Sequence, residues 1–205
     1  MVVANNLNYS EVGKKLGVSK NRISIWCQGL AGTRWASLIK KNQQKRNITL
    51  NSEIGILRKF DIDNNRAKLC AGIMYGCEGS KYPSSNGVAF TNSDSNLVAA
   101  FISLMRKAFR LDETKWRVHL LIHSNQNYSQ MVSYWSRLLK VQKSQFIKPT
   151  ITVPLGKKHR NEYKGTCSLR YNSCVLQLKL IGIFEAFMRK SMSLEGGQNG
   201  YAQVR

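Results

Sequence analysis

Hydrophobic residues recur with two periods along the chain, and the period changes from segment to segment. Apolar residues spaced three and four apart are typical of amphipathic helices, and they predict helices over residues 65–78, 95–110, 128–141 and 174–190. Alternating apolar and polar residues are typical of strands with one buried face, and they occur in KWRVHLLIH, FIKPTITV and TCSLRYN. From residue 64 onward the chain is therefore expected to be α+β.

The apolar stripes of the helices are expected to form the core of this region. In residues 95–110, where Asp94 is a candidate N-cap, the stripe is Leu97, Phe101, Leu104, Met105 and Ala108. The stripe of the third helix is Met131, Val132, Trp135, Leu138 and Leu139, and that of the fourth is Leu176, Leu180, Ile183, Phe184 and Phe187. No cofactor role is expected for these residues.

The strands are expected to place basic and hydrogen-bonding side chains on one face of a sheet. In KWRVHLLIH the inward set would be Trp116, Val118, Leu120 and Ile122, with Arg117, His119, Leu121 and His123 outward. Such a surface can contact phosphates and base edges. The DNA-binding candidates of this region are Lys115, Arg117, His119, Lys148, Thr150, Thr152, Ser168 and Arg170. A sheet face that is merely solvated is the alternative.

The beginning of the chain has the pattern of two short helices joined by a tight turn. In YSEVGKKLGVSKNRISIWCQG, Gly17 suits a left-handed turn and Ser19 can cap the second helix. This arrangement predicts a helix-turn-helix within residues 1–30, with Ile23 and Trp26 facing inward. The residues left to contact DNA are Lys20, Asn21, Arg22 and Ser24. A helical hairpin without a ligand is the alternative.

Two further segments are less regular. Residues 31–63 have a basic start that looks helical, followed by a stretch without a clean period, and are interpreted as a basic connector. The glycine-rich residues 191–205 are interpreted as a flexible tail, and His159 lies in a basic loop suited to phosphate contact.

The charge of the chain indicates a polyanionic partner. It has 32 Lys and Arg against 11 Asp and Glu, a formal net charge of +21, and the excess is spread along its length. With the helix-turn-helix pattern this favours double-stranded DNA, and RNA is the alternative polyanion.

Several classes of protein are not indicated. The five cysteines include no C-x-x-C pair, so neither a zinc cage nor a disulfide framework is expected, and the cysteines are interpreted as buried apolar residues. No apolar run approaches the roughly 20 residues of a membrane span, and the start lacks a signal-peptide pattern. A cytoplasmic protein without membrane partners is expected. No P-loop occurs, so no nucleotide cofactor is expected.

Glycines cluster in the first helix of the α+β region. In LCAGIMYGCEGS, Gly72 and Gly76 lie four residues apart, with Gly79 after the acidic Glu78. Glycines on one face allow a second helix to approach closely, which would place Glu78 at the end of a tight helix contact. A buried helix ending in a glycine cap is the alternative.

This motif resembles the signature of the LAGLIDADG homing endonuclease family. AGIMYGCEG is a degenerate match in which Glu78 and Gly79 stand where the signature ends in Asp-Gly. The segments VAFTNSD, NLVAAFISLMRKAF, KWRVHLLIH, YWSRLLKV, FIKPTITV and YKGTCSLR are similar to the family's strands and helices in order, so the resemblance covers roughly residues 66–188.

The resemblance implies a LAGLIDADG-like α/β domain over residues 64–190 with an antiparallel sheet that saddles the DNA. One copy of the motif implies a homodimer in which Gly72, Gly76 and Gly79 form the dimer interface. It also implies that the two Glu78 carboxylates bind Mg²⁺ and act as the catalytic groups in site-specific cleavage of phosphodiester bonds. Glu in place of the usual Asp lengthens the acidic side chain.

Two other functions fit the same resemblance. A bacterial family of sporulation regulators pairs a LAGLIDADG-like fold with a helix-turn-helix without nuclease activity, which would make this chain a transcriptional regulator. An RNA-binding, maturase-like role also occurs in the family. The acid at position 78 favours the nuclease.

Overall fold

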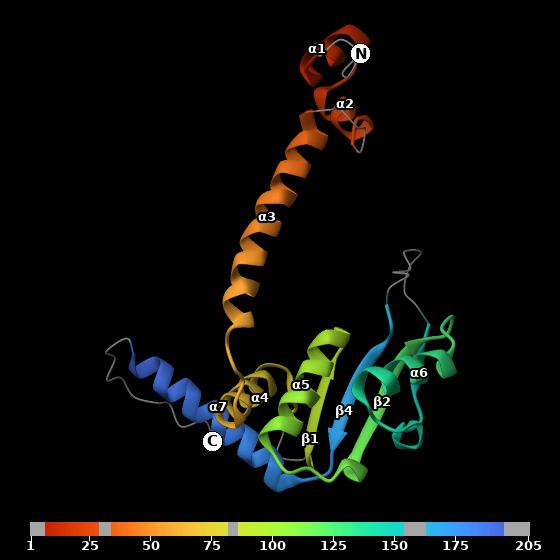
Figure 1. Ribbon diagram of the computed structural model, residues 1–205. Coiled ribbons are helices and arrows are strands. Elements are labelled where there is room, and N and C mark those ends of the chain that lie inside the picture. The colour runs from red at the N-terminus through yellow and green to blue at the C-terminus, as the bar shows by residue number, and fades with distance from the viewer. Residues whose placement is uncertain (1–6, 29–33, 82–85, 154–162, 195–205) are drawn as a thin grey trace. The chain divides into compact units, whose positions relative to one another are not determined.

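The computed structural model describes residues 7–28, 34–81, 86–153 and 163–194. The chain divides into two compact units, Met1–Asp61 and Ile62–Arg205 (Figure 1). Each unit is described by itself.

The first unit begins with two short helices, α1 (Tyr9–Leu16) and α2 (Lys20–Trp26). Asn8 caps α1 in a capping box with Glu11, and Ser19 caps α2 by accepting a hydrogen bond from the Arg22 amide. Gly17 ends α1 with φ of 65°, a left-handed conformation that glycine adopts without strain. The helix, turn and second helix predicted from the sequence are present.

A small apolar cluster holds these two helices together. Val12, Ile23 and Cys27 are buried in it. The side chain of Trp26 is 57% exposed, so the expectation that it faces inward is wrong. Helices of two turns present one narrow inner face, and Ile23 of α2 and Cys27, which caps the end of α2, occupy that face four residues apart.

The helix α3 (Arg34–Arg58) covers most of the segment interpreted as a connector. It is a single helix of 25 residues, and it continues through the stretch in which the sequence shows no clean period. The side chains described along it are exposed, including those of Ile48, Ile54 and Leu57.

The second unit alternates helices and strands in the order that the sequence predicts. Its elements are α4 (Asn64–Glu78), β1 (Val88–Asn92), α5 (Ser95–Ala108), η1 (Glu113–Lys115), β2 (Trp116–His123), α6 (Tyr128–Leu139), η2 (Lys143–Gln145), β3 (Thr150–Thr152), β4 (Thr166–Tyr171) and α7 (Cys174–Ser193). Asp94 caps α5 as expected, through the amides of Asn96 and Leu97. The helix α7 includes the first three residues of the segment interpreted as a tail, and residues 195–205 lie outside the described residues.

The four strands form one sheet in the order β1-β4-β2-β3. Strand β4 pairs antiparallel with β1 and with β2, whereas β3 pairs parallel with β2. The sheet is therefore mixed, and the expectation of an antiparallel sheet is wrong. The reason is the connection: α6 lies between β2 and β3, and a crossover through a helix returns the chain in the same direction.

The core lies between one face of this sheet and the helices of the second unit (Figure 1). The four residues of β2 predicted to face inward, Trp116, Val118, Leu120 and Ile122, are all buried. Phe90 of β1 stacks on Phe101 of α5 with ring centroids 4.1 Å apart. With the helices on this face, the opposite face of the sheet carries the alternate residues of each strand.

The cysteines do not share one environment. Cys27 and Cys167 are buried as expected, but Cys70, Cys77 and Cys174 are exposed, so the expectation is wrong for these three. All five are free thiols. Burial raises the pKa of the Cys167 thiol to about 12, which leaves it unreactive at neutral pH.

Candidate nucleic-acid interface

The outward face of the sheet carries a polar row that crosses all four strands. The strand pairings place Thr91 opposite Ser168, and Ser168 opposite His119. The Thr91 hydroxyl donates to the Ser168 hydroxyl at 2.8 Å, and His119 Nε2 lies 3.1 Å from the Thr150 hydroxyl. Ser168, in the middle of the row, is only 7% exposed. The row combines hydroxyl and imidazole groups, which can bind phosphate oxygens or base edges.

Two arginines lie side by side next to this row. Arg117 of β2 and Arg170 of β4 are direct cross-strand partners, and both are exposed. Two like charges at this spacing destabilise a sheet unless an anion lies between or above them. One guanidinium nitrogen of Arg117 donates to the carbonyls of Thr114 and Trp116, each at 2.7 Å, so the side chain is held in place.

A hollow of about 530 Å³ begins at these arginines and is lined also by Asn172, which follows β4. None of the outward residues of the four strands is Asp or Glu. The surface around the arginine pair is thus basic and open, as a phosphate site requires.

His119 is the titratable group at the centre of the face. Partial burial and the neighbouring positive charge of Arg170 both lower its pKa. Its imidazole is therefore neutral at pH 7 and can accept or donate one hydrogen bond through each nitrogen.

The other candidates on the sheet surround this centre. Thr152 lies opposite His123 on β3, and its hydroxyl is 3.2 Å from His123 Nδ1. Lys115, at the end of η1, and Lys148, just before β3, are both exposed. Leu121 is the apolar exception on the face, as the sequence indicates. His159 lies outside the described residues.

Thr91 was not among the residues expected from the sequence. Its segment, VAFTN, is only five residues long. In it Thr91 is an exposed position between Phe90, which is buried, and Asn92, which is partly buried. The alternation of this short strand was the available signal, and the pairing with Ser168 that gives Thr91 its place is not visible from local sequence.

The helix-turn-helix places its four candidates at the start of the second helix. Lys20, Asn21 and Arg22 are exposed in the first turn of α2, and Ser24 is partly exposed. Side chains at the amino-terminal end of such a helix are the ones that reach base edges in the major groove.

Glu78, the candidate catalytic acid, is the last residue of α4 and is exposed. Its Oε2 accepts a hydrogen bond from Asn92 Nδ2 at 3.2 Å, which ties the end of α4 to the end of β1. Gly79 continues from it in extended conformation and bridges to Phe90 of β1. The carboxylate therefore lies at one end of the sheet.

The residues around Glu78 do not form a Mg²⁺ site within one chain. Mg²⁺ prefers about six oxygen ligands, usually including one or more carboxylates. The side-chain oxygen of Asn92 accepts the Asp94 amide at 2.8 Å, and Glu78 Oε2 accepts from Asn92 Nδ2, so both side chains already have hydrogen-bond partners. No group of three or more His, Cys, Asp or Glu side chains suited to a metal occurs among the described residues.

The glycines of α4 contact the last helix of the same chain. A methyl group at Gly72 would overlap Ile183 of α7, and one at Gly76 would overlap the ring of Phe184. Gly79 is close to Tyr75 of its own helix. These contacts explain Gly72 and Gly76 within one chain, because they let α4 and α7 approach closely. The dimer interface expected at these glycines remains a prediction.

In the parts of the chain that the structure describes, no helix combines the length and the apolar character needed to span a membrane. Comparisons of the chain with protein families, with curated proteins and with solved structures found no match.

Proposed function

We propose that the protein binds double-stranded DNA through the outward face of its sheet and through its amino-terminal helix-turn-helix. The observation that carries the proposal is the arginine pair, Arg117 and Arg170, beside a polar row on a sheet face without acidic residues. Basic groups neutralise phosphates, and the hydroxyls and imidazole of the row can bind phosphate oxygens or base edges.

Duplex DNA is favoured over RNA because of the first unit. The exposed residues at the start of α2 suit the major groove of B-form DNA, which admits a helix. The major groove of duplex RNA is too deep and narrow for protein side chains to reach and recognise the bases. A DNA-binding regulator is the biological role that requires DNA binding alone, without cleavage.

The proposal can be tested by fluorescence anisotropy with a duplex DNA and an RNA duplex of the same sequence. We expect tighter binding to DNA, and Arg117→Ala with Arg170→Ala should weaken it on the order of tenfold or more through lost phosphate contacts. Arg137→Ala is the control, because Arg137 is exposed on α6, among the helices on the other face. Unchanged affinity in the double variant would reject the sheet as the interface, and tighter RNA binding would favour the RNA alternative.

Cleavage by a homodimer is a second proposal, supported by the exposed Glu78 carboxylate that Asn92 positions at the end of α4. It rests on the resemblance of residues 66–188 to the LAGLIDADG family. Because the described residues of one chain include no group of three or more His, Cys, Asp or Glu side chains suited to a metal, this proposal relies on the carboxylate of a second copy. A dimer through Gly72 and Gly76 would also require α7 to leave the face of α4 that it covers.

A further inference from the structure

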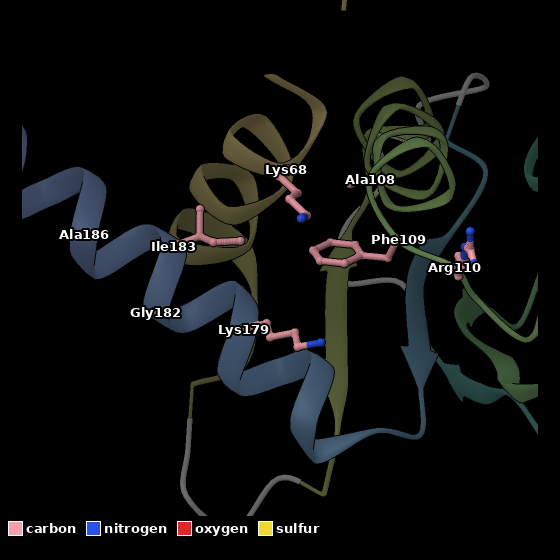
Figure 2. Close-up of a pocket in the computed structure, with 8 residues that line it drawn as sticks. All are labelled: Lys68, Ala108, Phe109, Arg110, Lys179, Gly182, Ile183 and Ala186. Atoms are coloured by element: carbon pink, nitrogen blue, oxygen red, sulfur yellow. The ribbon is translucent and has the colours of Figure 1, made fainter. Parts of the chain in front are cut away.

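A second basic hollow lies among the helices of the second unit, between α4, the end of α5 and α7 (Figure 2). Its volume is about 590 Å³, within the range of pockets that hold small molecules. Lys68 comes from α4, Phe109 follows α5, and Lys179 and Gly182 come from α7. Arg110, Ala108, Ile183 and Ala186 complete the lining.

The pocket combines an aromatic ring with positive charge from two helices. Figure 2 shows the Phe109 ring in the space between α4 and α7, with the side chains of Lys68 and Lys179 reaching toward that space. The ammonium of Lys68 is 5.9 Å from the centre of the ring. Among the described residues, no acid lines the pocket and none forms an ion pair with Lys68, Lys179 or Arg110. The cations are therefore available to an anion.

Gly182 is the feature of this pocket that packing among the described residues does not explain. It lies in the interior of α7, where glycine weakens a helix relative to alanine. A methyl group at Gly182 would meet no atom of the described residues within 4 Å, in contrast to the crowded Gly72 and Gly76. A glycine at this position leaves the wall of the pocket open for a ligand to approach the backbone.

We propose that this pocket binds a nucleobase together with its phosphate. The base stacks on Phe109 and lies along the open wall at Gly182, and the phosphate lies between Lys68 and Lys179. Base stacking on aromatic side chains and phosphate contacts by lysine are the usual means of holding unpaired nucleotides. The site needs no P-loop, since side chains supply the phosphate contacts. The same chemistry is offered by a free nucleotide and by the end of a single strand.

The test uses isothermal titration calorimetry with the full chain and four probes: AMP, ribose 5-phosphate, a short 5′-phosphorylated oligothymidylate and polyglutamate. We expect AMP or the oligothymidylate to bind at least about tenfold more tightly than ribose 5-phosphate, which carries the same phosphate but has no base to stack. Gly182→Leu should abolish this binding by filling the pocket, and Lys179→Gln should weaken it about tenfold by removing one phosphate contact.

Matched controls separate the pocket from general effects. Gly55→Leu changes a helical glycine of α3 that also has no neighbour within 4 Å, and Lys107→Gln removes an exposed charge of α5 that does not line the pocket. Both should bind the probes as the unchanged protein does. Duplex binding through Arg117 and Arg170 should persist in Gly182→Leu. Loss of probe binding at the pocket can therefore be distinguished from loss of duplex binding at the sheet face.

The outcomes are distinct. Binding of AMP alone identifies a free nucleotide as the ligand, and tighter binding of the oligothymidylate identifies a single-strand end, provided that Gly182→Leu weakens it. The proposal is overturned if Gly182→Leu weakens the binding of neither AMP nor the oligothymidylate, if ribose 5-phosphate binds equally well, if no probe binds, or if polyglutamate binds more tightly, which would indicate an acidic protein segment.

Discussion

His119 shows how a single residue responds to its neighbours on the sheet face. Partial burial and, after it, the charge of Arg170 lower the pKa of its imidazole, while its Nε2 lies beside the Thr150 hydroxyl. Bound phosphate reverses part of this effect, because a nearby negative charge favours the protonated ring.

A pH dependence of the proposed DNA binding is expected from this environment. The pKa of His119 in the free protein is below the ordinary histidine value of about 6.5. DNA affinity should therefore rise as the pH falls below about 6.5, because the ring gains a positive charge that attracts phosphate. His119→Gln keeps hydrogen-bonding capacity but cannot be protonated, so it should flatten the dependence. Anisotropy titrations from neutral to mildly acidic pH give the answer, and the same slope in His119→Gln would show that another group titrates.

Glu78 is the residue on which the proposed cleavage would depend. Under the second proposal, Glu78→Gln should abolish Mg²⁺-dependent nicking of a plasmid library while the fold and DNA affinity survive. Binding should tighten slightly, since one negative charge near the phosphates is removed. A wild-type protein that binds but never nicks with Mg²⁺ or Mn²⁺ would reject cleavage and leave the regulator, and normal cutting by Glu78→Gln would reject this catalytic assignment.

At the scale of elements, the tight contact of α4 with α7 sets the most specific requirement on sequence. Gly72→Ala and Gly76→Ala should each lower the free energy of unfolding by about 1–3 kcal/mol, because the added methyl overlaps Ile183 or Phe184. Gly182→Ala is the matched control on α7. It should raise stability by up to about 1 kcal/mol, since its methyl meets nothing. Urea denaturation gives the free energy of unfolding of all three variants. Unchanged stability in Gly72→Ala and Gly76→Ala would contradict the close α4–α7 contact.

The exposed Arg22 on α2 allows a separate test of the first unit. Arg22 is exposed in the first turn of α2, so Arg22→Ala should cost on the order of 1–3 kcal/mol on a cognate duplex if the side chain binds a base. Binding-site selection from a random duplex library, followed by titration of both proteins, provides the measurement. No loss would return α1 and α2 to the role of an ordinary helical hairpin.

The elements themselves could be predicted well where a local pattern determines them. The periodicity of residues 95–110 and 128–141 predicts α5 and α6 to within two residues at each end, and the alternation of β2 predicts its buried residues. These features follow from spacing within one segment.

The features that the sequence did not predict depend on contacts between segments that are distant in the chain. The parallel pairing of β3 with β2 is set by the α6 crossover, and a small-residue pattern such as Gly72 and Gly76 fits a second copy as well as α7. The pocket at Phe109 joins α4, α5 and α7, so no single stretch of sequence indicates it. The exposure of Trp26 likewise reflects how little surface two short helices can cover.

At the scale of the whole molecule, the net charge of +21 is the property that the proposed DNA binding would use most directly. Basic residues occur on the outward sheet face and at the start of α2, so both units should contribute phosphate contacts. Such contacts release condensed counterions, which makes binding depend strongly on salt.

The salt dependence of duplex binding is the most direct test of the proposed interface. The logarithm of the association constant of the full chain should fall linearly and steeply with the logarithm of salt concentration, and Arg117→Ala with Arg170→Ala should reduce the slope by about 2, roughly 1 per lost phosphate contact. Arg137→Ala should leave the slope unchanged. A flat response in the wild-type protein, or the same slope in the double variant, would contradict DNA binding through this face of the sheet.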